Sequence, residues 1–305
     1  MRVDNRFAIE WSGLGFVAAL ATVITLTLSA PAPAANSSEN TASNQAAANA
    51  ALAHQLLDQS NFKPLLASWR ETLAQSADYG QNELDKQTRA RFASCWRSAV
   101  LKSFDTNAAQ QKLAQLFAER LKTEELKQLI ALRQSPLGEK ISKTEQSFYS
   151  RAKDTEKSVA WMIEASARLE EDPKRKALIE AIAQLSGGTK ALTDALTNIS
   201  VGVSVGAESA KPAGQQRNSP EEIVAIVEQQ SGQLWQHLDA VVVTQNEMLY
   251  EHLSLADLGK HKAFLESKLG RRQTEATLDA FNRLMRDEAL AIGARFANEW
   301  RSQDL

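Results

Sequence analysis

The chain has 305 residues, of which 43% are hydrophobic and 24% are charged, as in an ordinary soluble globular protein. Its net charge is −2 and it has no long run of one sign, which argues against a nucleic-acid binder. One cysteine, Cys95, excludes an intramolecular disulfide and a multi-cysteine metal site. Apolar neighbours at helical spacing predict that Cys95 is a small buried side chain rather than a reactive thiol.

The N-terminal segment differs from the rest of the chain. No charge occurs from Trp11 to Ala30, and small residues follow at Ala32 and Ala34. This order predicts a secretory signal peptide over residues 1–34, with cleavage after Ala34. The apolar stretch is also long enough to span a bilayer, so an uncleaved inner-membrane anchor is the alternative. Both interpretations predict a periplasmic or otherwise extracytoplasmic location.

Beyond a polar, small-residue stretch at 35–50, which predicts a flexible lead-in, the pattern is helical almost throughout. The segment 201–206, VGVSVG, contains a G-x-x-x-G spacing that predicts a tight helix crossing, with a short strand as the alternative. Residues 207–218 are the most linker-like interior stretch. The last helix carries one apolar stripe from Leu278 to Trp300.

Several helix starts are marked by capping residues. Asp172 precedes Pro173, which suits an N-cap followed by proline at the first helical position. Ser219 is followed three residues later by Glu222, which completes a capping box. Ser254 begins a similar arrangement.

A short motif breaks the helical pattern twice. Ser135, Pro136 and Gly138 form the first copy, and Ser267 and Gly270 form the second, with Lys268 in place of the proline. We expect each serine to cap the following helix and each glycine to permit close approach of a neighbouring helix. A serine nucleophile would need a base and an oxyanion hole, and no histidine lies near Ser135 in sequence.

The motif lies inside a longer internal similarity, which relates residues from 118 onward to residues from 250 onward. An upstream pair of segments, beginning at 51 and 177, also resemble one another. We therefore predict an all-α protein of two tandem antiparallel helical-bundle repeats, 51–170 and 171–305, after the N-terminal signal segment. The helix after each corner should be long, 136 to about 170 and 268 to about 302, and a groove should lie between the repeats.

The stretch LKTEELKQLIALRQSPLGEK, residues 121–140, resembles the bacterial domain-of-unknown-function family numbered 2059. Leu132 and Arg133 stand where that family usually has aromatic residues, whereas Phe264 restores the aromatic in the second copy. The resemblance is stronger over 51–150 than over 173–285. It implies an exported, all-helical bacterial protein, and it transfers no functional residues because the family has no established activity.

Other candidate chemistry is weak. His252 and His261 are too far apart around a helix to share a face, and His54 and His237 form no metal-binding pair, so we expect surface or partly buried histidines and no metal site. Adjacent acids, such as Glu124 and Glu125, are interpreted as helix caps and solvated faces. The tryptophans are expected to pack in the core.

The sequence therefore indicates a non-enzymatic interaction or structural module of the bacterial cell envelope, without a cofactor. Two alternatives remain: a binder of an apolar small molecule or lipid in the groove between the repeats, and a hydrolase using unrecognised acids. The expected partner is an envelope protein or an apolar ligand and not a nucleic acid. Membrane contact is expected only through the N-terminal segment, if it is uncleaved.

Overall fold

A computed structural model of the chain describes residues 41–78, 85–151, 155–209, 211, 217–235 and 238–302. Within these ranges the protein is all-α, with no strand, as predicted. The helices up to the middle of the chain are α2 (Thr41–Gln59), α3 (Phe62–Gln75), the 3-10 turn η3 (Ser76–Asp78), α4 (Lys86–Ser103), α5 (Thr106–Arg120), α6 (Thr123–Arg133), α7 (Pro136–Arg151) and α8 (Thr155–Glu171). The remaining helices are α9 (Pro173–Leu185), α10 (Gly188–Ser209), α11 (Pro220–Trp235), α12 (Leu238–Tyr250), α13 (Leu255–Glu266) and α14 (Lys268–Ser302). The signal segment, 1–34, lies outside the described residues.

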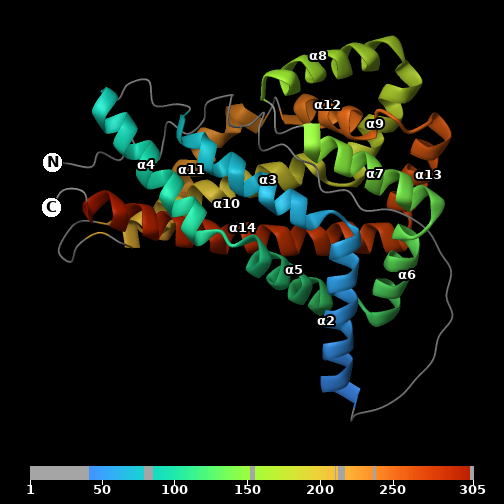
Figure 1. Cartoon of the computed structure of the whole chain (residues 1–305), viewed down its shortest axis with the longest axis horizontal. Helices are drawn as coiled ribbons and strands as arrows, with labels where there is room; N and C mark the ends of the chain where they lie inside the picture. Colours follow the sequence, from blue (N-terminus) through green and yellow to red (C-terminus); the bar gives the residue numbers. More distant parts are fainter. Residues whose placement is uncertain are drawn as a thin grey trace.

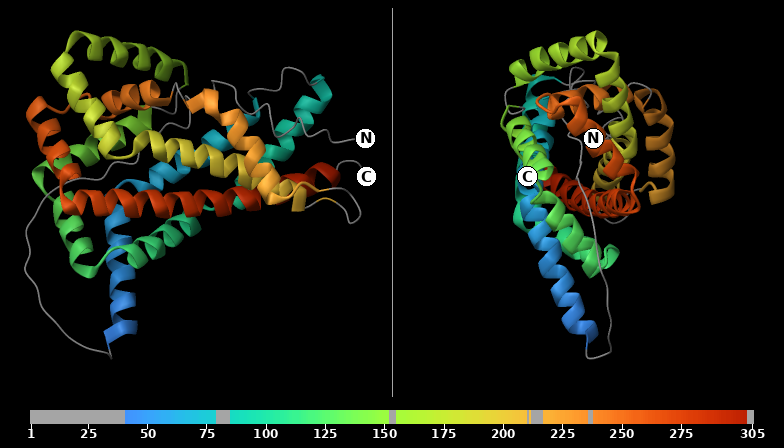
Figure 2. Two further views of the ribbon diagram at one scale, coloured as in Figure 1. Left: turned by 180° about the vertical axis from the view of Figure 1, so that it is seen from behind. Right: turned by 90° about the vertical axis from the view of Figure 1, so that its right-hand side faces the viewer.

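The long C-terminal helix α14 runs through the molecule and organises the packing (Figure 1). It packs most extensively on α10, and also on α4, α5 and α13. Figure 2 shows the same arrangement from behind, with α2 projecting away from the α14 axis. Helices from both ends of the chain therefore share one core, which α14 closes.

The crossing of α10 and α14 depends on glycine. A Cβ on Gly202 would lie 2.6 Å from the Cβ of Ala289, and one on Gly206 would lie 2.4 Å from the carbonyl oxygen of Leu290. From the other side, a Cβ on Gly293 would lie 2.2 Å from the carbonyl oxygen of Val203. No side chain fits at these distances, so the two backbones meet directly. The predicted tight crossing at 201–206 is confirmed, and its strand alternative is wrong because these residues lie within α10.

Aromatic side chains pack the C-terminal end of α14 against α4. The ring of Phe296 lies 5.1 Å from that of Phe92 and 5.9 Å from that of Trp96, both edge-on. Such pairs contribute about 0.5–1.5 kcal/mol beyond the area they bury. The apolar stripe of the last helix therefore joins the end of the chain to its first third.

Corresponding helices in the two halves pack in the same pairs. Helix α2 packs on α6 as α9 packs on α13, and α3 packs on α4 as α10 packs on α11. The two positive-φ residues in the described part, Asn61 (φ 52°) and Gly187 (φ 66°), each follow a serine at the first corner of their half. These are features that a duplication predicts. The duplication and its boundaries, 51–170 and 171–305, stay a prediction.

Two predicted elements were wrong. The helix expected over 136 to about 170 is two helices, because α7 ends at Arg151 and α8 turns to lie over α9 and α12, where it buries Trp161 and Leu169. Residues 41–50 were expected to be part of a flexible lead-in, but they are helical and begin α2. Alanine, which is frequent there, has the highest helix propensity.

We expect Gly293→Val to destabilise the fold by about 3 kcal/mol or more, because the added side chain overlaps the α10 backbone. Gly259→Ala is the control, because a Cβ at this α13 position meets no atom within 4 Å. That change should stabilise by about 0.5–1 kcal/mol. Urea unfolding followed by circular dichroism measures both, and equal stabilities for the two variants would contradict the tight crossing.

Candidate interaction site

The two predicted corners have the same local geometry. The Oγ of Ser135 accepts a hydrogen bond from the Gly138 amide at 3.1 Å, and the Oγ of Ser267 accepts one from the Gly270 amide at 3.0 Å. Each serine caps the first turn of the following helix, α7 or α14. The Ser135 hydroxyl also donates to the Leu132 carbonyl at 2.7 Å, so both of its hydrogen-bonding roles are structural.

Glycine is required at both corners for one reason. A Cβ on Gly138 would lie 2.2 Å from the Leu132 carbonyl oxygen, and one on Gly270 would lie 2.1 Å from the Phe264 carbonyl oxygen. In each copy the end of the preceding helix therefore touches the backbone of the next. Pro136 occupies the first position of α7. The geometry at these residues is that of a bend.

Behind the first corner lies a buried ion pair that the sequence reasoning missed. The Arg133 guanidinium contacts the Glu145 carboxylate at 3.2 Å, and both side chains are almost completely buried. Asn61 donates to Glu145 at 3.0 Å and to the Ser142 carbonyl at 3.1 Å. Burial raises the pKa of the Glu145 carboxyl, and the Arg133 guanidinium opposes that rise. The cluster joins the α2–α3 and α6–α7 corners.

A second buried polar pair lies nearby. His261 is fully buried, which corrects the expectation of surface or partly buried histidines. Its Nε2 lies 3.2 Å from the Tyr250 hydroxyl, whereas its Nδ1 has no hydrogen-bond partner. Burial, and secondarily the Arg133 charge, lower the pKa of His261 to about 3. The imidazole is therefore neutral in the folded protein.

A third network fixes α8. The Glu247 carboxylate, which is fully buried on α12, accepts from Arg175 Nε at 2.6 Å and from Arg168 Nε at 3.0 Å. Arg175 also donates to the backbone carbonyls of Tyr250 and Leu253 at 2.7 and 2.8 Å. One carboxylate thus holds the end of α8, through Arg168, and the start of α9, through Arg175, against α12.

A neighbouring acid fixes the other half of α8. Glu251 accepts from the indole Nε1 of Trp161 at 2.8 Å and from Arg168 Nη2 at 3.2 Å, and it also pairs with Arg151. The Arg151 guanidinium stacks on the Trp161 ring, 3.7 Å from its centroid. These pairings are spread over about a hundred residues of sequence, so no local pattern predicts them.

The opposite face of α8 is exposed and carries apolar side chains beside the exposed acids Glu164 and Glu170. Val159 and Ile163, one turn apart, are 55% and 67% exposed, with Ala160 and Ala167 exposed beside them. Large apolar residues at this exposure are uncommon when adjacent on one helix face. We call this surface, defined by Val159, Ala160, Ile163 and Ala167, the α8 face. It can accept an apolar partner surface.

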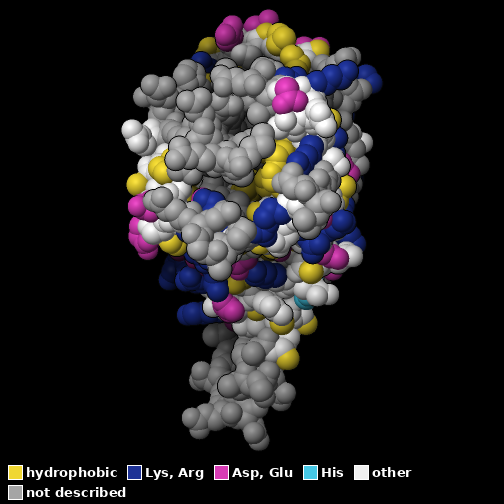
Figure 3. Space-filling view, turned by 90° about the vertical axis from the view of Figure 1, so that its left-hand side faces the viewer, with side chains coloured by type: hydrophobic (Ala, Val, Ile, Leu, Met, Phe, Trp, Pro, Cys, Tyr) yellow, Lys and Arg dark blue, Asp and Glu magenta, His cyan; other side chains and the backbone are white. Residues whose placement is uncertain are grey.

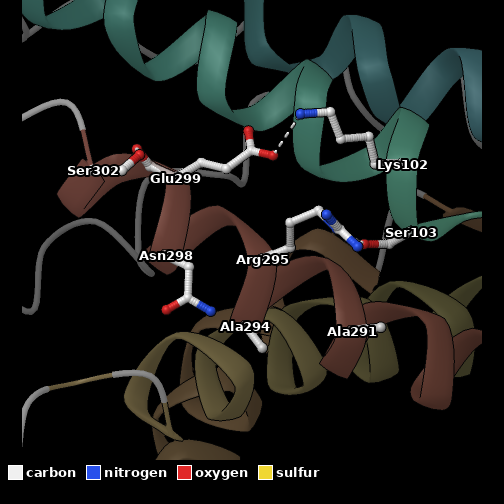
Figure 4. Close-up of a pocket in the computed structure, with 8 residues that line it drawn as sticks. All are labelled: Lys102, Ser103, Ala291, Ala294, Arg295, Asn298, Glu299 and Ser302. Carbon is white, nitrogen blue, oxygen red and sulfur yellow. Dashed lines mark hydrogen bonds and ion pairs between the residues drawn. The ribbon is translucent and has the colours of Figure 1, made fainter.

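A hollow of about 670 Å³ lies between α4 and the last turns of α14 (Figure 4). Six of its eight lining residues have polar or charged side chains and two are alanines: Lys102, Ser103, Ala291, Ala294, Arg295, Asn298, Glu299 and Ser302. Lys102 pairs with Glu299 at 3.1 Å.

The remaining candidates are dispersed. Cys95 is buried, and burial raises the pKa of its thiol, which favours the inert form. Trp69, Trp96 and Trp161 are buried as expected. His252 is exposed and contacts Glu251, and His237 lies outside the described residues. Within the described ranges, no three metal-ligating side chains converge, and no helix is both long and apolar enough to cross a membrane.

These features define an all-α protein with serine-capped corners and a charge-fixed outer helix. Residues 107–164 match the family described as "Uncharacterized protein conserved in bacteria (DUF2059)". The resemblance seen at 121–140 is thereby confirmed, and the matched segment runs from α5 through the first corner to Val159 and Ile163. No curated protein and no solved structure matches the chain.

Burial of neutral His261 predicts acid sensitivity. An unfolded histidine binds a proton near pH 6.5, whereas the folded one resists protonation down to about pH 3. The stability contributed by this group is therefore present above pH 6.5 and is lost as the pH falls toward 3. The loss is on the order of 1.4 kcal/mol per pH unit in that window. His261→Gln should flatten the pH dependence of the free energy of unfolding between pH 6.5 and 4.

Urea unfolding at a series of pH values measures that dependence. His252→Gln, at an exposed histidine, is the matched control and should keep the wild-type slope. A His261→Gln protein with the wild-type slope would contradict a neutral buried imidazole.

Proposed function

We propose that this protein is an exported, non-enzymatic interaction module of the bacterial cell envelope that binds a partner protein through the α8 face. The single observation that carries the proposal is the exposure of Val159 and Ile163 on a helix whose other side is firmly held. Burying the exposed parts of both side chains in a complex would contribute about 1–2 kcal/mol each.

Rigidity supports an interaction role. A binding face loses affinity when its own helix must be ordered on association. Here Arg168 and Trp161 fix α8 to Glu247 and Glu251 before any partner arrives. The face is thus presented in one conformation.

The surroundings of the buried acids support a role without catalysis. A catalytic carboxylate must reach a substrate. Glu145 and Glu247 are buried and are occupied by arginine or asparagine donors, and Glu251 is shared among Arg151, Arg168 and Trp161. Each of these three acids joins separate helices.

Export rests on the N-terminal sequence. The charge-free stretch from Trp11 to Ala30 and the small residues Ala32 and Ala34 have the order of a signal peptide. The protein recovered from a periplasmic fraction should begin within about two residues of Ala35, as measured by intact-mass spectrometry. Ala32→Arg combined with Ala34→Arg should block cleavage. A wild-type protein that keeps Met1 and stays in the cytosolic fraction would refute export.

Photo-crosslinking tests the α8 face. Ile163→p-benzoylphenylalanine should give a discrete adduct in envelope extract, because the probe lies at the centre of the face. Adding Val159→Glu to that variant should abolish the adduct by placing a charge in the contact.

The control probe replaces Leu255, a 40% exposed leucine at the start of α13, and should give no such adduct. Equal labelling from positions 163 and 255, or an adduct that survives Val159→Glu, would count against the proposal.

A further inference from the structure

Helix α4 has an unusual charge for this protein. It contains five basic residues and no acidic residue, in a chain whose net charge is −2. The basic residues are Lys86, Arg89, Arg91, Arg97 and Lys102. Asp85, just before the helix, is occupied at the N-cap, where its carboxylate accepts from the Gln87 and Thr88 amides at 2.9 and 3.0 Å. Helix α4 itself therefore has an excess of positive charge, of which Lys102 is paired with Glu299 on α14.

The exposed side of α4 has a narrow uncharged strip between its basic residues. Phe92 and Trp96 face the core, and the opposite side of the helix, at Ala90, Ser94 and Leu101, faces solvent. Leu101, the large apolar member of this strip, is 44% exposed.

Basic residues flank the strip on both sides, as helical geometry requires of their positions. Lys86 and Arg97 lie on one flank. Arg91, which stacks on the Trp300 ring, and Lys102, which pairs with Glu299, lie on the other. The small side chains of the strip, from Ala90 to Ser94, let a flat surface approach the helix between the two rows of cations.

The end of α14 extends the basic surface. Arg295 is exposed, and its Nε donates to the Ser103 hydroxyl at 3.1 Å, which holds the guanidinium beside the end of α4 (Figure 4). Arg301 follows nearly two turns later, and Glu299 is the one acid between them. Figure 3, which faces this end of the molecule, shows Lys and Arg side chains interspersed with Asp and Glu side chains. We call α4 together with residues 295–301 the basic end.

We propose that the basic end binds the surface of an anionic lipid bilayer, with lysine and arginine contacting headgroup phosphates and Leu101 entering the interface. Helices that lie on membranes combine basic flanks with apolar side chains between them, and each cation near an anionic surface adds to the attraction. Because Leu101 is the one large apolar side chain of the strip, most of the attraction here comes from the cations. The helix is already folded against a protein core, so binding requires no folding step.

A bilayer fits this surface better than a nucleic acid does. Single-stranded nucleic acid is held by stacking on exposed aromatic rings, but the α4 aromatics, Phe92 and Trp96, are buried. Duplex DNA would contact the cations but leave Leu101 without an apolar partner. A lipid surface offers partners to the cations and to Leu101, because headgroup phosphates and the hydrocarbon region lie within one interface.

This inference rests on the proposed envelope location for its setting, but it uses a helix other than α8. Loss of vesicle binding would therefore leave the crosslinking result at Ile163 untouched, and the reverse also holds. The two proposals can fail separately.

Co-sedimentation with lipid vesicles tests the membrane-binding proposal. The protein is purified from the periplasmic fraction, so that its N-terminal segment is processed as it is in the cell. Vesicles of phosphatidylglycerol mixed with phosphatidylcholine are compared with vesicles of phosphatidylcholine alone. The wild type should prefer the anionic vesicles, and added salt should weaken that preference. A triple variant, Lys86→Gln, Lys102→Gln and Arg295→Gln, should lose on the order of 100-fold in that preference.

The matched control is Lys174→Gln, Lys176→Gln and Arg271→Gln, which removes the same charges from exposed positions on α9 and the start of α14. It should bind as the wild type does. If the first triple variant fails to fold, as judged by thermal melting, Lys86→Glu alone replaces it. Lys86 is exposed at the first position of α4, and its reversal should reduce the preference by on the order of tenfold.

Three results would overturn the proposal. The first is that the wild type and the basic-end triple variant bind anionic vesicles equally. The second is that the control triple variant loses as much preference for anionic vesicles as the basic-end variant does. The third is that duplex DNA, at equal phosphate concentration, binds the protein as strongly as anionic vesicles do or more strongly.

Discussion

The direct backbone contact between α10 and α14 sets the architecture. Gly202, Gly206 and Gly293 add no side chain of their own at the crossing, so the helices approach more closely than three side chains there would allow. Because α14 also packs on α4 and α5, while α10 packs on α11 and α12, the position of most other helices follows from this contact. A single methyl group at the crossing would therefore be felt far from it.

Buried charge supplies a second layer of constraint. Arg133 with Glu145, and Arg168 and Arg175 with Glu247, each join separate helices. Buried ion pairs often add little net stability, because desolvation offsets their attraction, but removing one partner costs several kcal/mol. Their effect here is to fix which helices meet and at what rotation. The α8 face owes its outward direction to the pairs that Arg168 makes.

Local signals in the sequence carried much of this structure. The Asp172 cap, the Ser219–Glu222 box and the G-x-x-x-G crossing are confirmed, because a few neighbouring residues determine each of them. The networks that hold α8 could not be read in the same way, because their partners are roughly 70 to 100 residues apart along the chain. The burial of His261 depends on how α13 packs against α9 and α14, which no local pattern shows. Because the orientation of α8 depends on these distant contacts, the α8 face on its outer side could not be predicted from the sequence.

The contact between α4 and α14 has a consequence for biosynthesis. Phe92 and Trp96 are covered by Phe296, which is made about two hundred residues later. Until the last turns of α14 emerge, α4 has an uncovered aromatic side, and a chain in this state is prone to aggregate.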